Sequence, residues 1–251
     1  MGGLTLLALI ALMAFICEYI DSSLGMGYGT ILSPVLIIMG FDPLIVLPAV
    51  LFSQALGGFV AAVFHHGFEN VNFTAGSRDS KIVLIITIFG IVATIFAALI
   101  AVNIPGTVLK TYIGCLILVM GIIMLSRRQF KFSWNKMIGI GILSAFNKGI
   151  SGGGFGPVVT SGQIISGHQH KNAIGVTTLA EAPICISAFL THMLARGAAD
   201  WPLITALCIG SVAVAPLGAL TTKKIAPEKL KFILGVLVAL LGAWVLVKTW
   251  L

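Results

Sequence analysis

The sequence predicts an all-α integral membrane protein with two inverted repeats, each a broken, re-entrant helical hairpin followed by three transmembrane helices. Three observations lead there: the composition, two glycine-rich breaks inside apolar stretches, and the placement of the basic residues. The chain has 251 residues, of which 58% are hydrophobic and 9% are charged, and its mean hydropathy is +1.09. Soluble domains carry about 25% charged residues, so we expect this chain to lie in a membrane.

The first repeat is expected over residues 1–126. An apolar run of about 14 residues from Leu4 to Cys17 ends at several polar side chains, and a second run of similar length follows the break. A full span needs about 20 residues, and shorter runs are typical of re-entrant segments. Three longer apolar runs then predict spanning helices over 44–64, 82–102 and 105–126. No Lys or Arg precedes the first run, so we expect it to be retained rather than cleaved as a signal peptide.

The second repeat is expected over residues 137–251 and follows the same order. A broken segment over 137–167 precedes predicted spans over 172–194, 202–222 and 232–247. Residues 127–136 hold four basic residues and no acid, and form the expected cytoplasmic linker. We expect the two repeats to build one transport domain.

Sliding the chain on itself supports a duplication. Many positions match at an offset of 127, and after a loss of six residues more match at an offset of 121. Spaced glycines and a histidine carry this argument, because apolar matches mean little in so hydrophobic a chain. The matches are Gly25, Gly27, Gly29, Ala61 and His65 with Gly152, Gly154, Gly156, Ala188 and His192, then Lys110, Gly114 and Gly121 with Lys231, Gly235 and Gly242; Gln54 falls on Glu181 and Asp21 on Lys148.

The basic residues favour hairpins over full crossings at the two breaks. If both broken segments return to the side they entered, eleven Lys and Arg face the cytoplasm and three face outward, leaving out Lys148. If all eight segments cross, the best split is eight against six. Positively charged loops collect on the cytoplasmic side. The eight-span alternative stays open, because Leu4 to Ile20, about 25 Å long as a helix, could nearly cross.

The breaks place polar groups at membrane depth. Residues 147–157 bring one asparagine, one lysine, one serine and five glycines into an apolar stretch. Helix amides follow both breaks, at Tyr28–Thr30 and Phe155–Val158, and such helix starts attract anions. Lys148 adds a positive charge and nearby serines add hydroxyl donors, a combination that suits a small oxyanion. The alternative is that the glycines only allow tight helix packing and that Lys148 pairs with Asp21.

Three acids lie within the predicted membrane segments: Glu18, Asp21 and Glu181. Each is either a proton carrier, cation site or gate, or a hydrogen-bonded acid that holds helices together. His65 and His192 end equivalent spans, where we expect them at membrane interfaces. His168 and His170 are two ligands only, so no metal site is expected.

Other functional classes receive little support. The chain has no zinc-protease or serine-hydrolase motif, and its glycine boxes fit neither a nucleotide loop nor a dinucleotide fingerprint. The basic residues lie in short loops, so nucleic acid is not an expected partner. We expect no enzyme activity and no cofactor. An intramembrane enzyme would make a new chemical species, whereas a transporter moves its substrate unchanged.

At this point the sequence resembles the TauE/SafE family, also called the toluene-sulfonate uptake permease family. The resemblance rests on the boxes Gly25–Gly29 and Gly152–Pro157, each followed by a small polar run, Ser53-Gln54 and Thr177–Glu181. It covers essentially the whole chain. It implies a secondary transporter of sulfur-containing anions, such as sulfite, sulfoacetate or other organosulfonates, in a multi-pass fold of a bacterial inner membrane. The first box departs from the pattern at Met26, where a third glycine is expected.

The candidate site lies between the two breaks. Expected partners are the small anion, the lipid bilayer and a proton or cation for coupling, and a homodimer stays open. A small carboxylate on the same architecture is the alternative substrate. The candidate substrate-binding residues are Ser22, Ser23, Gly25, Gly27, Tyr28, Gln54, Asn147, Lys148, Ser151, Gly152, Gly153, Gly154, Phe155, Thr177 and Thr178, and the candidate coupling residues are Glu18, Asp21 and Glu181.

Overall fold

The computed structural model describes residues 3–125, 134–165, 168–197, 199–222 and 227–251, and all regular structure within them is helical. This confirms the predicted all-α class. Residues 127–133 of the predicted linker 127–136 lie outside the described residues, and residues 134–136 form the start of a helix. The helices are α1 (Gly3–Leu24), α2 (Tyr28–Ile38), α3 (Pro43–Gly67), α4 (Arg78–Asn103), α5 (Gly106–Leu125), α6 (Trp134–Ser151), α7 (Phe155–Ile165), α8 (His170–Arg196), α9 (Trp201–Thr221) and α10 (Pro227–Trp250).

Seven of the described helices are long and apolar enough to cross a membrane: α1, α3, α4, α5, α8, α9 and α10. The chain is therefore a multi-pass membrane protein. The predicted short first arm is wrong, because α1 is 22 residues long and runs through the polar side chains that were expected to end it, as far as Leu24. The polar side chains, which include Glu18, Asp21 and Ser22, are buried inside the protein rather than exposed to lipid, so the helix does not have to end where they begin.

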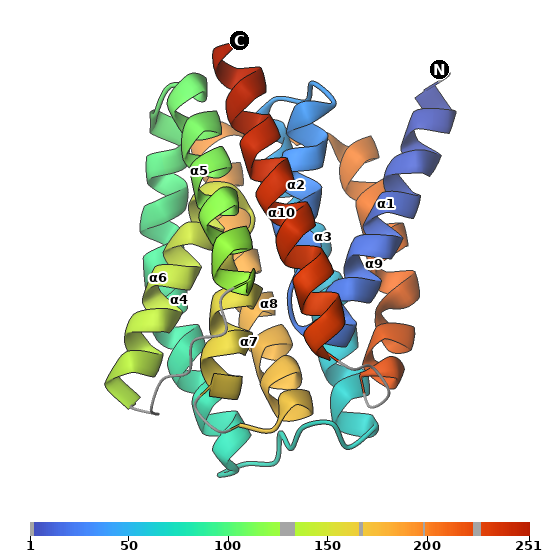
Figure 1. The fold of residues 1–251 in the computed structure, drawn as a ribbon, viewed down its shortest axis with the longest axis vertical. Helices are drawn as coiled ribbons and strands as arrows, with labels where there is room; N and C mark the ends of the chain where they lie inside the picture. The colour runs from blue at the N-terminus through green and yellow to red at the C-terminus, as the bar shows by residue number, and fades with distance from the viewer. Residues whose placement is uncertain (1–2, 126–133, 166–167, 198, 223–226) are drawn as a thin grey trace.

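Both broken segments turn back on themselves (Figure 1). Helix α1 runs from the N-terminal end of the molecule toward the other end, and α2 returns; α6 and α7 make the same turn from the opposite end. The six remaining long helices alternate in direction, and both termini lie at one end. This is the course that the hairpin interpretation predicts. That the halves are duplicated and inserted upside down in a membrane stays a prediction.

Several contacts recur at the offsets found in the sequence. Each of these contacts joins a residue of the first half of the chain to a residue of the second half. A methyl group on Gly25 would lie 2.7 Å from Thr160 Oγ1, and one on Gly152 would lie 2.7 Å from Ser33 Oγ. Gly121 packs on Ala239 just as Gly242 packs on Leu118. Such paired contacts are what a duplicated fold would produce, so they support the predicted repeat.

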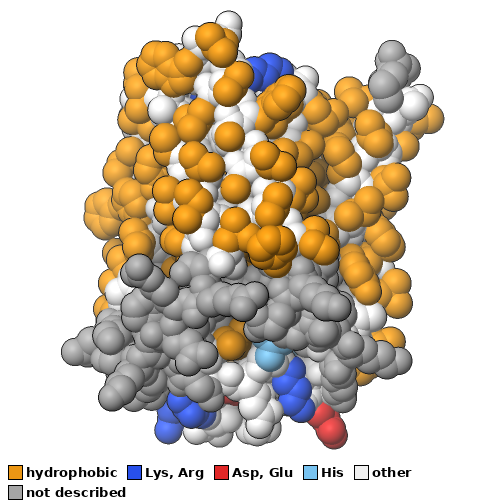
Figure 2. All heavy atoms as spheres, in the orientation of Figure 1, with side chains coloured by type: hydrophobic (Ala, Val, Ile, Leu, Met, Phe, Trp, Pro, Cys, Tyr) orange, Lys and Arg blue, Asp and Glu red, His pale blue; other side chains and the backbone are white. Residues whose placement is uncertain are grey.

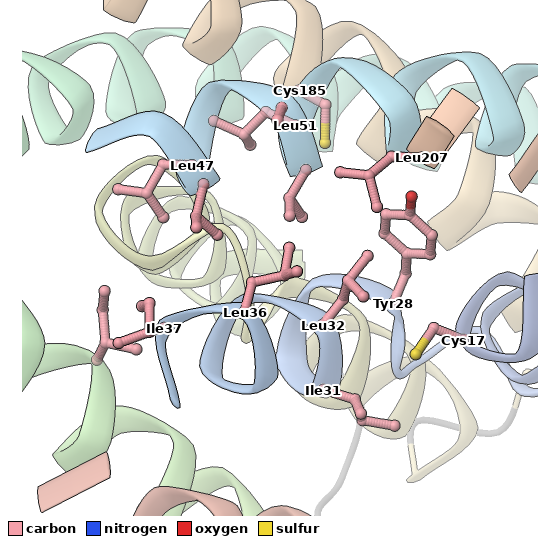
Figure 3. Close-up of a cluster of buried hydrophobic side chains, with 14 of the residues drawn as sticks. Cys17, Tyr28, Ile31, Leu32, Leu36, Ile37, Leu47, Leu51, Cys185 and Leu207 are labelled. Atoms are coloured by element: carbon pink, nitrogen blue, oxygen red, sulfur yellow. The ribbon is translucent and has the colours of Figure 1, made fainter. Parts of the chain in front are cut away.

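Helix α2 is enclosed by protein. Leu32 and Leu36 point from α2 toward the side of α3 that carries Leu47 and Leu51, whereas Tyr28 points toward Leu207, and all six residues are fully buried (Figure 3). The outer surface of this face is apolar over most of its height, and charged side chains are seen only at its two ends, with more of them at the lower end (Figure 2). Backbone that is not helical is tolerated at membrane depth only inside protein or beside a cavity, and burial of the hairpins meets that condition.

Candidate functional site

Glycine ends the first helix of each hairpin. Gly25 and Gly152 both have a φ of +70°, and Gly27 and Gly154 have φ values of +141° and +81°. Residues with a Cβ rarely adopt this left-handed region. The spaced glycines of the two boxes are therefore required by the chain reversal itself.

The two reversals are pressed against each other. A methyl group on Gly153 would lie 2.9 Å from the backbone of Gly29, and one on Gly156 would lie 2.9 Å from Met26 Cα. Gly29 directly faces the Gly152 carbonyl with no room for a Cβ. For these glycines, the packing interpretation accounts for the pattern: two backbones approach more closely than any side chain would allow.

Hydrogen bonds join the hairpins across this contact. The Gly154 amide donates to Thr30 Oγ1 at 3.1 Å, and Thr160 Oγ1 donates to the Gly25 carbonyl at 2.7 Å. Each hairpin thus satisfies a backbone group of the other. The two breaks form one unit at the centre of the protein.

Lys148 lies at the end of α6, beside this unit, and its side chain is 1% exposed. Its Nζ forms an ion pair with Glu181 Oε1 of α8 at 2.8 Å and donates to Gln54 Oε1 of α3. The alternative direct pair with Asp21 is not the one formed: the ammonium group of Lys148 contacts Glu181 and Gln54 instead. The alternation of apolar residues gives no information on which acid a buried lysine meets across helices.

Asp21 joins the same network through Gln54. Its Oδ2 accepts from Gln54 Nε2 at 3.4 Å, and its Oδ1 accepts from the Tyr28 amide at the start of α2, at 3.1 Å. Gln54 therefore bridges the acid of one hairpin and the lysine of the other. We call the residues Asp21, Gln54, Lys148 and Glu181 the central cluster.

Glu18 lies one turn before Asp21 and is fully buried. Ser22 Oγ donates to its Oε1 at 2.7 Å, whereas its Oε2 has no hydrogen-bond partner. The charges of Asp21, Glu181 and Lys148 act on this carboxyl group. Three acids and one lysine thus share a small volume inside the membrane protein.

The other predicted site residues serve mostly as local structure. Ser23 and Thr178 donate to carbonyls of their own helices, and Thr177 bonds to Thr160. Ser151 bonds to the backbone of its own turn, and Phe155 lies in an apolar cluster. Asn147 Oδ1 accepts from Tyr112 at 2.6 Å. Tyr112 was not among the predicted site residues, because a single tyrosine in an apolar run does not distinguish a site residue from a packing residue.

Both histidines that were expected at membrane interfaces are buried inside the protein, and their depth in the membrane stays a prediction. His65 Nε2 contacts the Ser22 carbonyl at 2.9 Å, and His192 Nε2 contacts the Gly149 carbonyl at 3.3 Å. Each carbonyl belongs to the last turn of a hairpin's first helix, which leaves such groups without an intrahelical partner. The histidines therefore cap the broken helices.

A polar cavity of about 630 Å³ lies between the start of α4, the start of α8 and the loop after α3. Its lining includes Arg78, Asp79, His168 and Lys171. Burial and the nearby Arg78 lower the pKa of His168, which Asp79 partly opposes. Among the described residues, no group of three or more His, Cys, Asp or Glu side chains is placed to hold a metal ion.

A bundle of membrane-spanning helices with broken helices and buried charges at its centre is the architecture of a membrane transporter. The family model "Sulfite exporter TauE/SafE" matches residues 10–245. The chain belongs to this family.

Two curated relatives carry names of the same kind. The "Probable membrane transporter protein YtnM" of Bacillus subtilis (strain 168) is 26% identical over 259 residues, which cover 98% of this chain and 84% of that protein. The "Probable membrane transporter protein MJ0441" of Methanocaldococcus jannaschii is 23% identical over 267 residues, which cover 97% of this chain and 96% of that protein. No solved structure matches the chain. Family and relatives together support a membrane transporter.

Proposed function

We propose that the protein is a secondary transporter of small sulfur-containing anions, such as sulfite or organosulfonates, in a bacterial inner membrane. The anion is held at mid-membrane by Lys148, beside the two glycine-rich breaks. The family description and the relatives' names support transport in general, and the substrate class rests on the family description together with the site.

The observation that carries the proposal is the burial of Lys148. A charge in the middle of a membrane protein costs about 2.5–3.5 kcal/mol on insertion scales. Lys148 lies between the reversal of its own hairpin and the polar residues of α3 and α8. Intramembrane ionisable residues of this kind mark substrate and ion pathways, and an ammonium is a strong partner for sulfonate oxygens.

A substrate panel in proteoliposomes tests this function. Vesicles loaded with one unlabelled anion are diluted into the same labelled anion, and counterflow is measured for sulfite, sulfoacetate, a simple alkyl sulfonate and a carboxylate of matched size. We expect counterflow of the sulfur anions. If only the carboxylate were exchanged, the protein would be a transporter of small carboxylates, the alternative substrate class.

The same vesicles separate a transporter from an intramembrane enzyme. A transporter returns the labelled anion chemically unchanged, at a rate that depends on its gradient. Conversion of the anion into a new species would instead identify an enzyme.

A further inference from the structure

We infer that the transported anion and the Glu181 carboxylate compete for Lys148, so that binding of the anion is accompanied by uptake of one proton at Glu181. The inference rests on the proposed function, because it needs an anion at Lys148. It joins substrate binding and proton coupling in a single ion pair.

The first step concerns the ammonium, which is already occupied. Lys148 Nζ pairs with Glu181 Oε1 at 2.8 Å and also donates to Gln54 Oε1. Both side chains of the pair are almost fully buried, at 1% and 5% exposed. An anion that reaches Lys148 therefore meets a cation whose charge is neutralised by a carboxylate.

The second step concerns the total charge. Glu181 is faced by Lys148 from α6 and by Asp21 and Glu18 from α1, with the Cys185 thiol on its own helix. Lys148 thus faces three carboxyl groups, and even with one of them neutral an added sulfonate would increase the excess of negative charge. Opposite charges interact strongly and like charges repel strongly in a medium of low polarity. Protonation of one acid removes this conflict.

The third step identifies which acid takes the proton. Asp21 keeps two donors, the Tyr28 amide and Gln54, and hydrogen bonds to a carboxylate favour its ionised form. Glu18 has an oxygen without a partner, which suits an acid that is already neutral before the anion arrives. Glu181 is the acid that loses its ammonium when the anion binds, so the proton from water goes to its carboxylate.

Exchange of partners also explains how the anion and the proton move together. With the anion on Lys148 and a proton on Glu181, the central cluster has the same net charge as before, and Glu181 has become a neutral carboxylic acid. Release reverses both events, because the carboxylate regains the ammonium as the anion leaves. The pair therefore links one anion to one proton.

The test measures binding of an alkyl sulfonate to the purified full-length protein by titration calorimetry. A sulfonate is chosen because it stays ionised throughout the pH range, whereas sulfite titrates near neutrality. Proton uptake is obtained from two buffers of different ionisation enthalpy. We expect close to one proton to be taken up per anion at pH values where Glu181 is ionised. In that range the affinity for the sulfonate is expected to fall about tenfold for each unit by which the pH is raised.

Variants assign the proton to its carrier. Glu181→Gln keeps the size of the side chain and is expected to bind the sulfonate without proton uptake and with a flat pH profile. Asp21→Asn and Glu18→Gln are expected to keep the pH dependence. Loss of proton uptake in Asp21→Asn or Glu18→Gln but not in Glu181→Gln would overturn the assignment.

Two further outcomes separate the inference from the function. If the unmodified protein binds the sulfonate with no proton uptake at any pH, the inference is wrong and the proposed function stands. If it binds no sulfonate at any pH and catalyses no counterflow, the proposed function fails and the inference fails with it.

Discussion

At the scale of single residues, the pairing of Lys148 with Glu181 decides how its substitution behaves. Removing one partner of a buried pair leaves an uncompensated charge and costs about 3–5 kcal/mol. We therefore expect Lys148→Met to lower the melting temperature in detergent, and Lys148→Met with Glu181→Leu to restore most of it. In both variants the affinity for the anion is expected to be roughly 10- to 150-fold lower than in the unmodified protein. This factor corresponds to the loss of a charge-assisted hydrogen bond of about 1.5–3 kcal/mol.

The double variant distinguishes a binding lysine from a structural one. If stability and affinity both recover when Glu181 is also replaced, Lys148 serves only to neutralise that acid. Lys148→Arg gives an intermediate case, because a planar guanidinium keeps the charge but needs different room. It is expected to bind the anion more weakly than the unmodified protein and more strongly than Lys148→Met.

The sequence predicted the members of the central cluster better than their contacts. Lys148 and Glu181 stand out as charges in apolar runs. In the alignment of the two repeats, Gln54 is equivalent to Glu181 and Asp21 is equivalent to Lys148. Which of these residues meet depends on how α3, α6 and α8 cross, and a hydrophobic pattern does not encode that. The same limit explains the buried histidines, whose carbonyl partners lie about 43 positions away in the chain.

At the scale of elements, the contact between the two reversals predicts which glycines tolerate a side chain. Gly29→Ala places a methyl group against the Gly152 carbonyl, where only backbone could give way. Overpacking of this kind typically costs about 1–3 kcal/mol, and more when backbone must move. We expect a large fall in melting temperature and loss of transport.

Gly58→Ala is the matched control. Gly58 lies inside helix α3, and an added methyl group would meet Thr178 atoms only at 3.6 Å and beyond, an ordinary contact. Alanine is favoured over glycine inside a helix by about 0.8–1.0 kcal/mol, so stability is expected to stay level or rise. Equal tolerance of both substitutions would mean that the reversals are not in contact.

The lengths of the elements show where sequence reasoning failed. The spans after each break were predicted closely, because long apolar runs bounded by polar loops mark their ends. Helix α1 was predicted too short, since Glu18 and Asp21 look like an ending. They continue the helix because the surrounding helices bury them and because each has a hydrogen-bond partner. Ser22 of the same helix bonds to Glu18, and Gln54 of α3 and the Tyr28 amide of α2 bond to Asp21.

At the scale of the whole molecule, the course of the chain predicts which loops share a side of the membrane. The end of α3 and the start of α8 lie at the same end of the bundle (Figure 1), and Thr74 after α3 and Gln169 before α8 are both exposed. Single cysteines at these two positions in a cysteine-free background are expected to react with a membrane-impermeant reagent from the same side of the membrane. A cysteine at Gly40 is expected to show the opposite accessibility.

The eight-span alternative predicts a different labelling pattern. If residues 137–167 crossed the membrane, Thr74 and Gln169 would lie on opposite faces. Labelling from opposite faces would therefore exclude the hairpin and with it the inverted arrangement of the two halves.

Transport by this protein depends, in the function proposed above, on a buried lysine beside two helix breaks that carries an anion across the membrane. Counterflow of a labelled alkyl sulfonate in proteoliposomes tests it most directly, with Lys148→Ala compared with Lys110→Ala, a lysine on α5 outside the central cluster. Rapid exchange of unchanged sulfonate is expected for the unmodified protein and for Lys110→Ala, and loss of exchange for Lys148→Ala. Exchange by Lys148→Ala at the rate of the unmodified protein would contradict it.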